Sequence, residues 1–247
     1  MDGGVAIVTG AGQGIGEAIA KRLVVEGYAV VIAEQNYQSA LQVAREIAKA
    51  GGRASAYQTD VSDEESVKSV VQFTKDTYGR IDALVNNAGI HPKSLVINMS
   101  KQEWDTVIAV ILKGTYLFCK HVLPEMVSRR SGKIVNITSD QAFRGSSAFS
   151  HYSAAKAGVT ALTKSIALEV ASVGIQVNAI APGLTDTLMP RRHSSEEEMK
   201  AKASAVPMGR LAKPDEIAET VAYLLSSCNT FITGQTICVS GGKLMLG

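Results

Sequence analysis

Cysteine is scarce in this chain of 247 residues, which contains only Cys119, Cys228 and Cys238. The three lie far apart, without the spacing of metal ligands, and their odd number does not suit a disulfide framework. The sequence therefore predicts no metal site. It favours reduced thiols of the kind found in a cytoplasm, most of them simply buried.

Net charge and long apolar runs are also lacking. The formal charge is +2 and no long basic run occurs, which argues against nucleic acid as the main partner. The apolar run VIAVIL, residues 107–112, is far too short to span a bilayer. The first apolar run begins at Val5 with no basic segment before it, so no targeting segment is expected. We expect a soluble cytoplasmic protein with no membrane partner.

What the sequence does contain is an alternation of β-branched runs and helical patterns. With 46% hydrophobic and 19% charged residues, a sizeable core is possible. Strands are predicted at residues 5–9, 29–33, 54–58, 83–87, 133–138, 176–179 and 236–239. Helical spacing occupies stretches between them, such as residues 15–26, 40–50, 64–78 and 217–226. This alternation favours an α/β fold with a parallel sheet covered on both faces.

No internal repeat, low-complexity tract or linker interrupts the pattern, so residues 1–247 are predicted to form a single domain. Around residues 104–123 apolar side chains occur on nearly every helical face, and residues 153–171 are rich in alanine. A helix that is apolar all round is buried on several sides. We expect these two helices to be buried in the core and partly by another subunit.

A glycine-rich stretch follows the first predicted strand, where residues 9–16 read TGAGQGIG. It does not match the G-x-G-x-x-G fingerprint, because the third glycine would fall at Ile15 or Glu17. The stretch nevertheless joins a strand to a helix, where glycine lets the backbone approach a pyrophosphate and the helix N-terminus attracts phosphate. By itself it fits either a dinucleotide loop of another kind or a glycine turn that packs strand on helix.

Read as TGxxxGxG, this loop resembles that of the short-chain dehydrogenase/reductase family, and the resemblance extends along essentially the whole chain. Asp60-Val61 resembles the family's adenine-contacting pair, residues 86–89 are its NNAG motif and residues 152–156 its YxxxK motif. Pro182-Gly183, with Thr187 beyond, resembles the segment that holds the nicotinamide carboxamide. The resemblance implies a single-domain Rossmann-type fold with a doubly wound parallel sheet of about seven strands, and a homotetramer.

The resemblance also implies the members of the site. The catalytic residues would be Ser139, Tyr152 and Lys156. The cofactor-binding residues would be Gly10, Gln13, Gly14, Ile15, Gly16, Glu34, Asp60, Val61, Asn87, Ala88, Gly89, Tyr152, Lys156, Pro182, Gly183 and Thr187.

Glu34, just past the second predicted strand, favours NAD as the cofactor. It follows Gly14 by about 20 residues, the spacing of an acidic residue that binds the adenosine ribose. A carboxylate there accepts hydrogen bonds from the ribose hydroxyls and repels a 2′-phosphate. NADP-using members usually place arginine or lysine in the loop or after this strand, where this chain has Gln13, Gln35 and Asn36. The alternative is that Glu34 is a solvated charge at a helix entry.

The chemistry is expected at Tyr152 and Lys156, which share one helix face because they are four residues apart. An unperturbed tyrosine has a pKa near 10. We expect the lysine ammonium and an oxidised nicotinamide to lower it, so that Tyr152 can exchange a proton with the substrate oxygen. Ser139 would hydrogen-bond the same oxygen. Taken alone, such a Tyr–Lys pair also fits an exposed helix surface.

One position departs from the family pattern. Many members carry an asparagine in the helix after NNAG, where it holds a water that links the lysine to a proton path, and here that position is Ile111. Either the enzyme works with a slower relay, or it has lost catalysis and kept NAD binding. A milder departure is Ser240, where an aspartate is common.

A substrate lid is expected at residues 188–210. Within it, Ser194 with Glu197 and Ser195 with Glu198 both fit a helix capping box. Arg191, Arg192 and His193 are either exposed surface charge or ligands for an anionic substrate. Candidate specificity residues by position flank the catalytic serine and tyrosine: Asp140, Gln141, Phe143, Arg144 and His151.

The main hypothesis is an NAD(H)-dependent alcohol dehydrogenase or carbonyl reductase that acts on a small-molecule secondary alcohol or ketone, with tyrosine as general acid/base. A 3-oxoacyl-carrier-protein reductase is the alternative enzyme, which this chain resembles in length and motif order. Glu34 argues against it, because that activity usually uses NADPH. A catalytically weak NAD-binding protein is the alternative from another class, and Ile111 motivates it.

Overall fold

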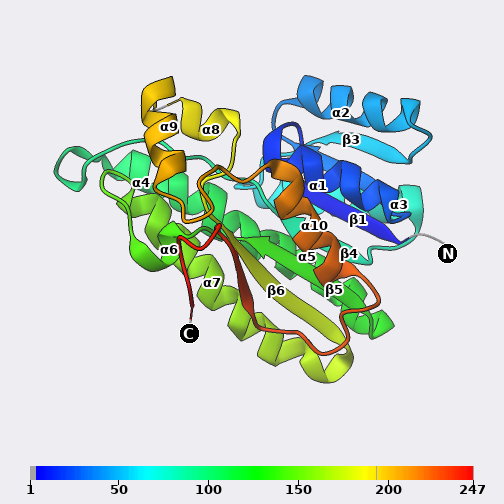
Figure 1. Cartoon of the computed structure of the whole chain (residues 1–247). Coiled ribbons are helices and arrows are strands. Elements are labelled where there is room, and N and C mark those ends of the chain that lie inside the picture. The colour runs from blue at the N-terminus through cyan, green and yellow to red at the C-terminus, as the bar shows by residue number, and fades with distance from the viewer. Residues whose placement is uncertain (1–3, 193, 247) are drawn as a thin grey trace.

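The computed structural model describes residues 4–192 and 194–246. Its seven strands form one parallel sheet in the order β3-β2-β1-β4-β5-β6-β7 (Figure 1). The strand order reverses between β1 and β4, the place where ligands bind in open α/β sheets. The strand bounds are β1 Val5–Thr9, β2 Ala29–Glu34, β3 Ala54–Gln58, β4 Ala83–Asn86, β5 Gly132–Ile137, β6 Ile175–Pro182 and β7 Thr236–Val239.

Helices connect successive strands, and several begin at side-chain caps. The Asn36 side chain accepts hydrogen bonds from two N–H groups at the start of α2, and Asp63 does the same for α3. The α-helices are α1 Gly14–Val25, α2 Tyr37–Lys49, α3 Glu64–Tyr78, α4 Lys101–Ile108, α5 Gly114–Arg129, α6 Gln141–Arg144, α7 Ser150–Val170, α8 Leu188–Arg191, α9 Glu196–Ser204 and α10 Pro214–Leu225.

The two faces of the sheet carry separate apolar cores, because the central strands are apolar on both sides. On one face α1, α2 and α10 pack over strand residues such as Val8, Ile32 and Val135. On the other, α3, α5 and α7 pack over residues such as Ile7, Val31 and Ile134. Figure 1 shows α1 and α10 in front of the sheet, with α8 and α9 standing beyond the carboxyl ends of its strands.

One helical stretch, Lys101–Arg129, consists of α4, a π-helical segment Ala109–Lys113 and α5. By length and composition alone it could cross a membrane. However, 44% of its most apolar window is buried inside the fold, and core helices pass the same test, so it is weak evidence of a span. The π-helical segment puts Ile111, which is 1% exposed, into the core.

The predicted fold class is confirmed: the sheet is parallel, has seven strands and is covered by helices on both faces. The strand boundaries agree to within three residues, and the largest difference is at β6, which continues to Pro182. The assignment of residues 1–247 to one domain stays a prediction.

Candidate active site

The glycine loop lies at the carboxyl end of β1 and needs its glycines for steric reasons. Gly10 and Gly14 have positive φ angles of 62° and 60°. A Cβ on Gly10 would lie 2.8 Å from Cα of Ala88, and one on Gly16 would lie 2.2 Å from the Gly10 carbonyl oxygen. Gln13, which precedes α1, makes no side-chain cap. The loop therefore holds the start of α1 uncapped by a side chain, as an anion-binding helix N-terminus requires.

The NNAG segment after β4 is fastened to this loop by hydrogen bonds. The Asn87 side-chain amide donates to the carbonyl oxygens of Thr9 and Gly10, both at 3.0 Å. The Thr9 hydroxyl oxygen accepts from the backbone N–H groups of Asn87 and Ala88, also at 3.0 Å. The ends of β1 and β4 thus form one rigid unit at the point where the strand order reverses.

The Glu34 carboxylate lies against the same loop from the end of β2. It accepts hydrogen bonds from the N–H groups of Gly12 and Asn36, each at 3.2 Å. Asp60, after β3, accepts from the backbone and hydroxyl of Ser62 at 2.8 and 2.6 Å. A carboxylate has about four acceptor positions, so both side chains retain acceptor capacity for a ribose or an adenine.

Other predicted cofactor residues also gather round the loop. The Thr187 methyl lies 3.3 Å from where a Cβ on Gly14 would be, and Ile15, in the first turn of α1, packs against the core. Gly183 follows β6, and a Cβ there would lie 2.8 Å from Cα of Ser240. Val61, in contrast, is buried against the backbone of Gly114 at the start of α5. The glycine loop, the NNAG segment and the segment after β6 therefore all lie at the carboxyl ends of the parallel strands.

The three predicted catalytic residues come together beside that edge. Ser139 follows β5, while Tyr152 and Lys156 are one turn apart on α7, and all three are buried. The Lys156 Nζ lies 5.8 Å from the centre of the Tyr152 ring and donates to the carbonyl oxygen of Ile137 at 2.6 Å. The arrangement places a hydroxyl, a phenol and an ammonium in one site, which suits proton transfer to or from an oxygen.

The expected lowering of the Tyr152 pKa is wrong for the protein by itself. Burial raises the pKa of Tyr152 to about 12; the hydrogen bond with Ser139 lowers it, and the charge of Asp140 raises it. Burial also lowers the pKa of Lys156 to about 8. The physical reason is that desolvation disfavours both charged forms, while the ammonium is directed at the Ile137 carbonyl.

Ile111 lies in a small apolar cluster with Val107, Tyr152, Ala155 and Val159. Its Cγ1 and the Lys156 Nζ lie 3.7 and 3.8 Å from the position of a Cβ on Gly89. The carbonyl oxygen of Ile111 accepts a hydrogen bond from the Thr115 hydroxyl at 2.8 Å. An apolar side chain and the lysine therefore line the same space at Gly89, and the apolar one stands where many family members have an amide.

Asp140 and Arg144 form an ion pair directly beside Ser139. The Arg144 Nε donates to Asp140 Oδ2 at 2.8 Å, and the Ser139 hydroxyl donates to Oδ1 of the same carboxylate at 3.3 Å. Because Arg144 is already paired with a buried carboxylate, the structure gives little support to Arg144 as the ligand of an anionic substrate. Phe143 is 38% exposed, and His151 is buried with its pKa lowered by burial.

His91 is a site residue that the sequence analysis missed. Its ring stacks on Phe149, with centres 3.9 Å apart, and meets the Tyr152 ring edge-on at 4.4 Å. Its position two residues after the NNAG motif was the available signal, but the loop that carries it has no periodicity from which a direction could be read.

The lid region, residues 188–210, contains α8 and α9. The Ser195–Glu198 capping box is present, whereas the Ser194 hydroxyl bonds to Lys202 instead of capping with Glu197. Arg191 pairs with Asp186 at 2.8 Å and with Glu196, which favours its interpretation as surface charge. Arg192 is exposed, and His193 lies outside the described residues.

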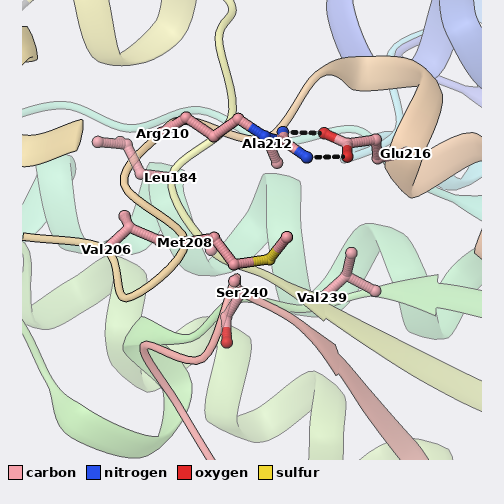
Figure 2. Close-up of a pocket in the computed structure, with 10 residues that line it drawn as sticks. Leu184, Val206, Met208, Arg210, Ala212, Glu216, Val239 and Ser240 are labelled. Atoms are coloured by element: carbon pink, nitrogen blue, oxygen red, sulfur yellow. Dashed lines mark hydrogen bonds and ion pairs between the residues drawn. The ribbon is translucent and has the colours of Figure 1, made fainter. Parts of the chain in front are cut away.

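A cavity of about 70 Å³ is lined by the segment after β6 and by residues before and within α10 (Figure 2). The Arg210 guanidinium closes one side through two hydrogen bonds to Glu216, at 2.7 and 2.6 Å. Neither Ser139, Tyr152 nor Lys156 lines it. Its lining consists of Gly183, Leu184, Val206, Met208, Arg210, Ala212, Glu216, Val239, Ser240 and Gly241.

Comparison with known proteins gives matches over nearly the whole chain. A family model described as enoyl-(acyl carrier protein) reductase matches residues 10–243. The chain is 37% identical to 3-oxoacyl-[acyl-carrier-protein] reductase FabG of Thermotoga maritima, over 99% of each chain. It is 41% identical to the FabG of Staphylococcus aureus, over 97% of this chain and 98% of that one. It is 39% identical to the FabG of Vibrio cholerae, over 100% and 99%.

Proposed function

We propose that this chain, which belongs to the short-chain dehydrogenase/reductase family, reduces the 3-keto group of a 3-oxoacyl thioester with NADH. The observation that carries the substrate class is the match, along the whole chain, to proteins named 3-oxoacyl-[acyl-carrier-protein] reductase. The comparisons thus support the alternative enzyme better than the alcohol dehydrogenase or carbonyl reductase expected first. As a member of this family the chain is an oxidoreductase. The identities of its substrate and of its cofactor are what we propose.

Ser139 and Tyr152 would bind the keto oxygen through their hydroxyl groups. When bound, a reduced nicotinamide supplies the hydride to the keto carbon. Tyr152 gives its phenolic proton to the oxygen, which completes the alcohol. A pKa raised to about 12 keeps this phenol protonated at neutral pH, as a general acid requires. The protonated phenol is the form that reduction of a keto group needs.

Lys156 would restore the proton to the site. With its pKa lowered to about 8, most of it is charged at pH 7, yet it can release a proton more easily than an exposed lysine. The Nζ is held by the Ile137 carbonyl, and the α7 backbone is held by a hydrogen bond from the Thr138 hydroxyl to the Lys156 carbonyl at 2.8 Å. Ile137 at the end of β5 and Thr138 directly after it thus hold the lysine side chain and its backbone in place.

The steric fit of the loop supports a dinucleotide, and Glu34 supports NADH in particular. Its carboxylate is held against the glycine loop by Gly12 and Asn36, so a 2′-phosphate on the adenosine ribose would meet a fixed negative charge. We expect kcat/KM to be at least about tenfold higher with NADH than with NADPH, the effect of about 1.4 kcal/mol.

The isosteric variant Glu34→Gln removes the charge and keeps an acceptor, so it should narrow this cofactor preference without loss of NADH binding. A lower KM with NADPH than with NADH in the unaltered protein would contradict the cofactor assignment. It would leave the substrate class in place.

The substrate class is tested with an acetoacetyl thioester and NADH, beside the variant Tyr152→Phe. Loss of turnover in the variant while NADH still binds would establish the reductase. The second candidate, a catalytically weak NAD-binding protein, is favoured by the apolar Ile111 next to Lys156. Tight NADH binding with no turnover on thioesters, ketones or alcohols would select that candidate.

The homotetramer, the acyl-carrier-protein partner and the cytoplasmic location are further parts of the proposal. Exposed apolar side chains such as Tyr116 on α5 and Leu168 on α7, the latter 85% exposed, support burial of these helices by another copy. Light scattering at micromolar concentration should give the mass of a tetramer, and a stable monomer would contradict it.

A further inference from the structure

His91 and Gln141 form a polar pair beside Tyr152, the proposed acid. Neither side chain has a role in the proton transfer proposed for Tyr152 and Lys156. The His91 ring lies between two aromatic rings, parallel to Phe149 with an interplanar angle of 10° and edge-on to Tyr152 at 87°. His91 comes from the loop after β4, whereas Tyr152 comes from α7. These two ring contacts fix the imidazole next to the phenol.

Gln141 lies next to both Ser139 and His91. Its backbone N–H donates to the Ser139 hydroxyl oxygen at 3.2 Å, and its side-chain nitrogen lies 3.4 Å from Nε2 of His91. Its side-chain oxygen is buried and has no hydrogen-bond partner among the described residues. Buried polar atoms without a partner are rare and call for an explanation such as a ligand.

The orientation of the amide decides which of its groups takes the position that has no partner. With the amide turned so that the imidazole Nε2–H donates to the amide oxygen, the amide NH₂ group takes that position and keeps both hydrogens. In this orientation the pair has N–H groups available for an acceptor placed beside Ser139 and Tyr152.

We propose that His91 and Gln141 bind a second carbonyl oxygen of the substrate, the thioester oxygen of a 3-oxoacyl chain. The inference rests on the proposed function, since the keto oxygen bound by Ser139 and Tyr152 is separated from the thioester carbonyl by a single CH₂ group. A carbonyl oxygen is an acceptor and the pair is a donor. The pair would therefore select 1,3-dicarbonyl substrates over simple ketones.

The experiment compares two substrates of NADH-dependent reduction: the N-acetylcysteamine thioester of acetoacetate, and a matched ketone with CH₂ in place of the thioester carbonyl. The readout is the ratio of kcat/KM for thioester to ketone. His91→Phe keeps the ring contacts and removes the imidazole nitrogens, while Gln141→Leu removes the amide. Each should lower the ratio about five- to tenfold, the effect of one neutral hydrogen bond.

Gln102→Leu is the matched control, because Gln102 is exposed on α4 and the same change there should leave the ratio as it is. Phe149→Leu separates packing from hydrogen bonding: it loosens the ring stack and should lower both kcat/KM values together. Thermal unfolding of each variant checks that it folds, and the two independent variants keep the test valid if one does not.

An equal loss on both substrates in His91→Phe and Gln141→Leu, or no loss on either, would overturn the inference and leave the proposed reductase standing. Reduction of the ketone but not of the thioester by the unaltered protein would overturn both. The two failures are thus distinguishable.

Discussion

The replacement of Ile111 by asparagine should make the protein less stable and faster. Ile111 is 1% exposed and packs with Val107, Tyr152, Ala155 and Val159. Removing this buried side chain from the core costs about 1.5–3 kcal/mol. A buried amide that finds no partner adds about 1–3 kcal/mol. We expect Ile111→Asn to lower the free energy of unfolding by about 3 kcal/mol, and the melting temperature by about 6–12 °C for a chain of this size.

The same amide would line the space at Gly89 that the Lys156 ammonium also lines, since the Ile111 Cγ1 and the Lys156 Nζ are both within 4 Å of the position of a Gly89 Cβ. There it can hold a water that hydrogen-bonds the lysine. Acid–base groups contribute about 10² to 10⁴ in rate, so even partial restoration of a relay should raise kcat at least about tenfold. KM for NADH should stay within about twofold, because no cofactor contact changes.

The assay is steady-state NADH oxidation with the acetoacetyl thioester, in H₂O and in D₂O, beside thermal unfolding by calorimetry. Ile111→Val is the control: it costs about 0.5–1.5 kcal/mol and brings no amide, so its kcat should not rise. A solvent isotope effect on kcat that is larger for the unaltered protein than for Ile111→Asn would agree with slow proton supply. Turnover of Ile111→Asn at the unaltered rate would show that Ile111 does not weaken a proton relay.

Three other outcomes are expected. Gly16→Ala should lower the melting temperature by about 2–12 °C through a clash of about 1–3 kcal/mol. Gly89→Ala is the control and should fold normally, because its Cβ would meet nothing closer than 3.7 Å. Equal changes of melting temperature for the two variants in calorimetry would contradict this prediction. Asp140→Asn removes a charge that raises the pKa of Tyr152. Alcohol oxidation needs the phenolate form, so the rise of its kcat/KM with pH should move to lower pH. A move to higher pH would count against this prediction. Lys133→Met loses two hydrogen bonds of 2.6 Å to carbonyl oxygens beyond α10 and should cost about 1.5–3 kcal/mol in denaturant unfolding, with no change in m-value.

Much of the fold was predictable because its signals are local. The apolar run of β1 and the glycines after it indicate a strand and a tight turn without any knowledge of tertiary contacts. The spacing of Tyr152 and Lys156 indicates a shared helix face, and the structure has both buried on α7. The predicted Ser195 cap is also local and is confirmed. Roles assigned to the site residues remain predictions.

Other features depend on contacts that periodicity cannot give. His91 meets Phe149 and Tyr152 across a long sequence separation, so no spacing rule indicates the stack. The π-helical turn at Ile111 has the same apolar pattern as an α-helix in the sequence. In the protein without a cofactor the pKa of Tyr152 is raised and not lowered, because burial, a property of the folded chain, outweighs the charge of a lysine whose ammonium is bonded to the Ile137 carbonyl. The effect of an oxidised nicotinamide on this pKa stays a prediction.

Protonation of the keto oxygen by the Tyr152 phenol, with NADH bound, is open to direct measurement. We suggest single-turnover oxidation of NADH by the acetoacetyl thioester, with the unaltered protein and Tyr152→Phe compared at equal NADH occupancy. We expect a rate loss of at least about 10² in the variant, with the dissociation constant of NADH changed by no more than about threefold. Reduction by Tyr152→Phe at a rate close to that of the unaltered protein would contradict it.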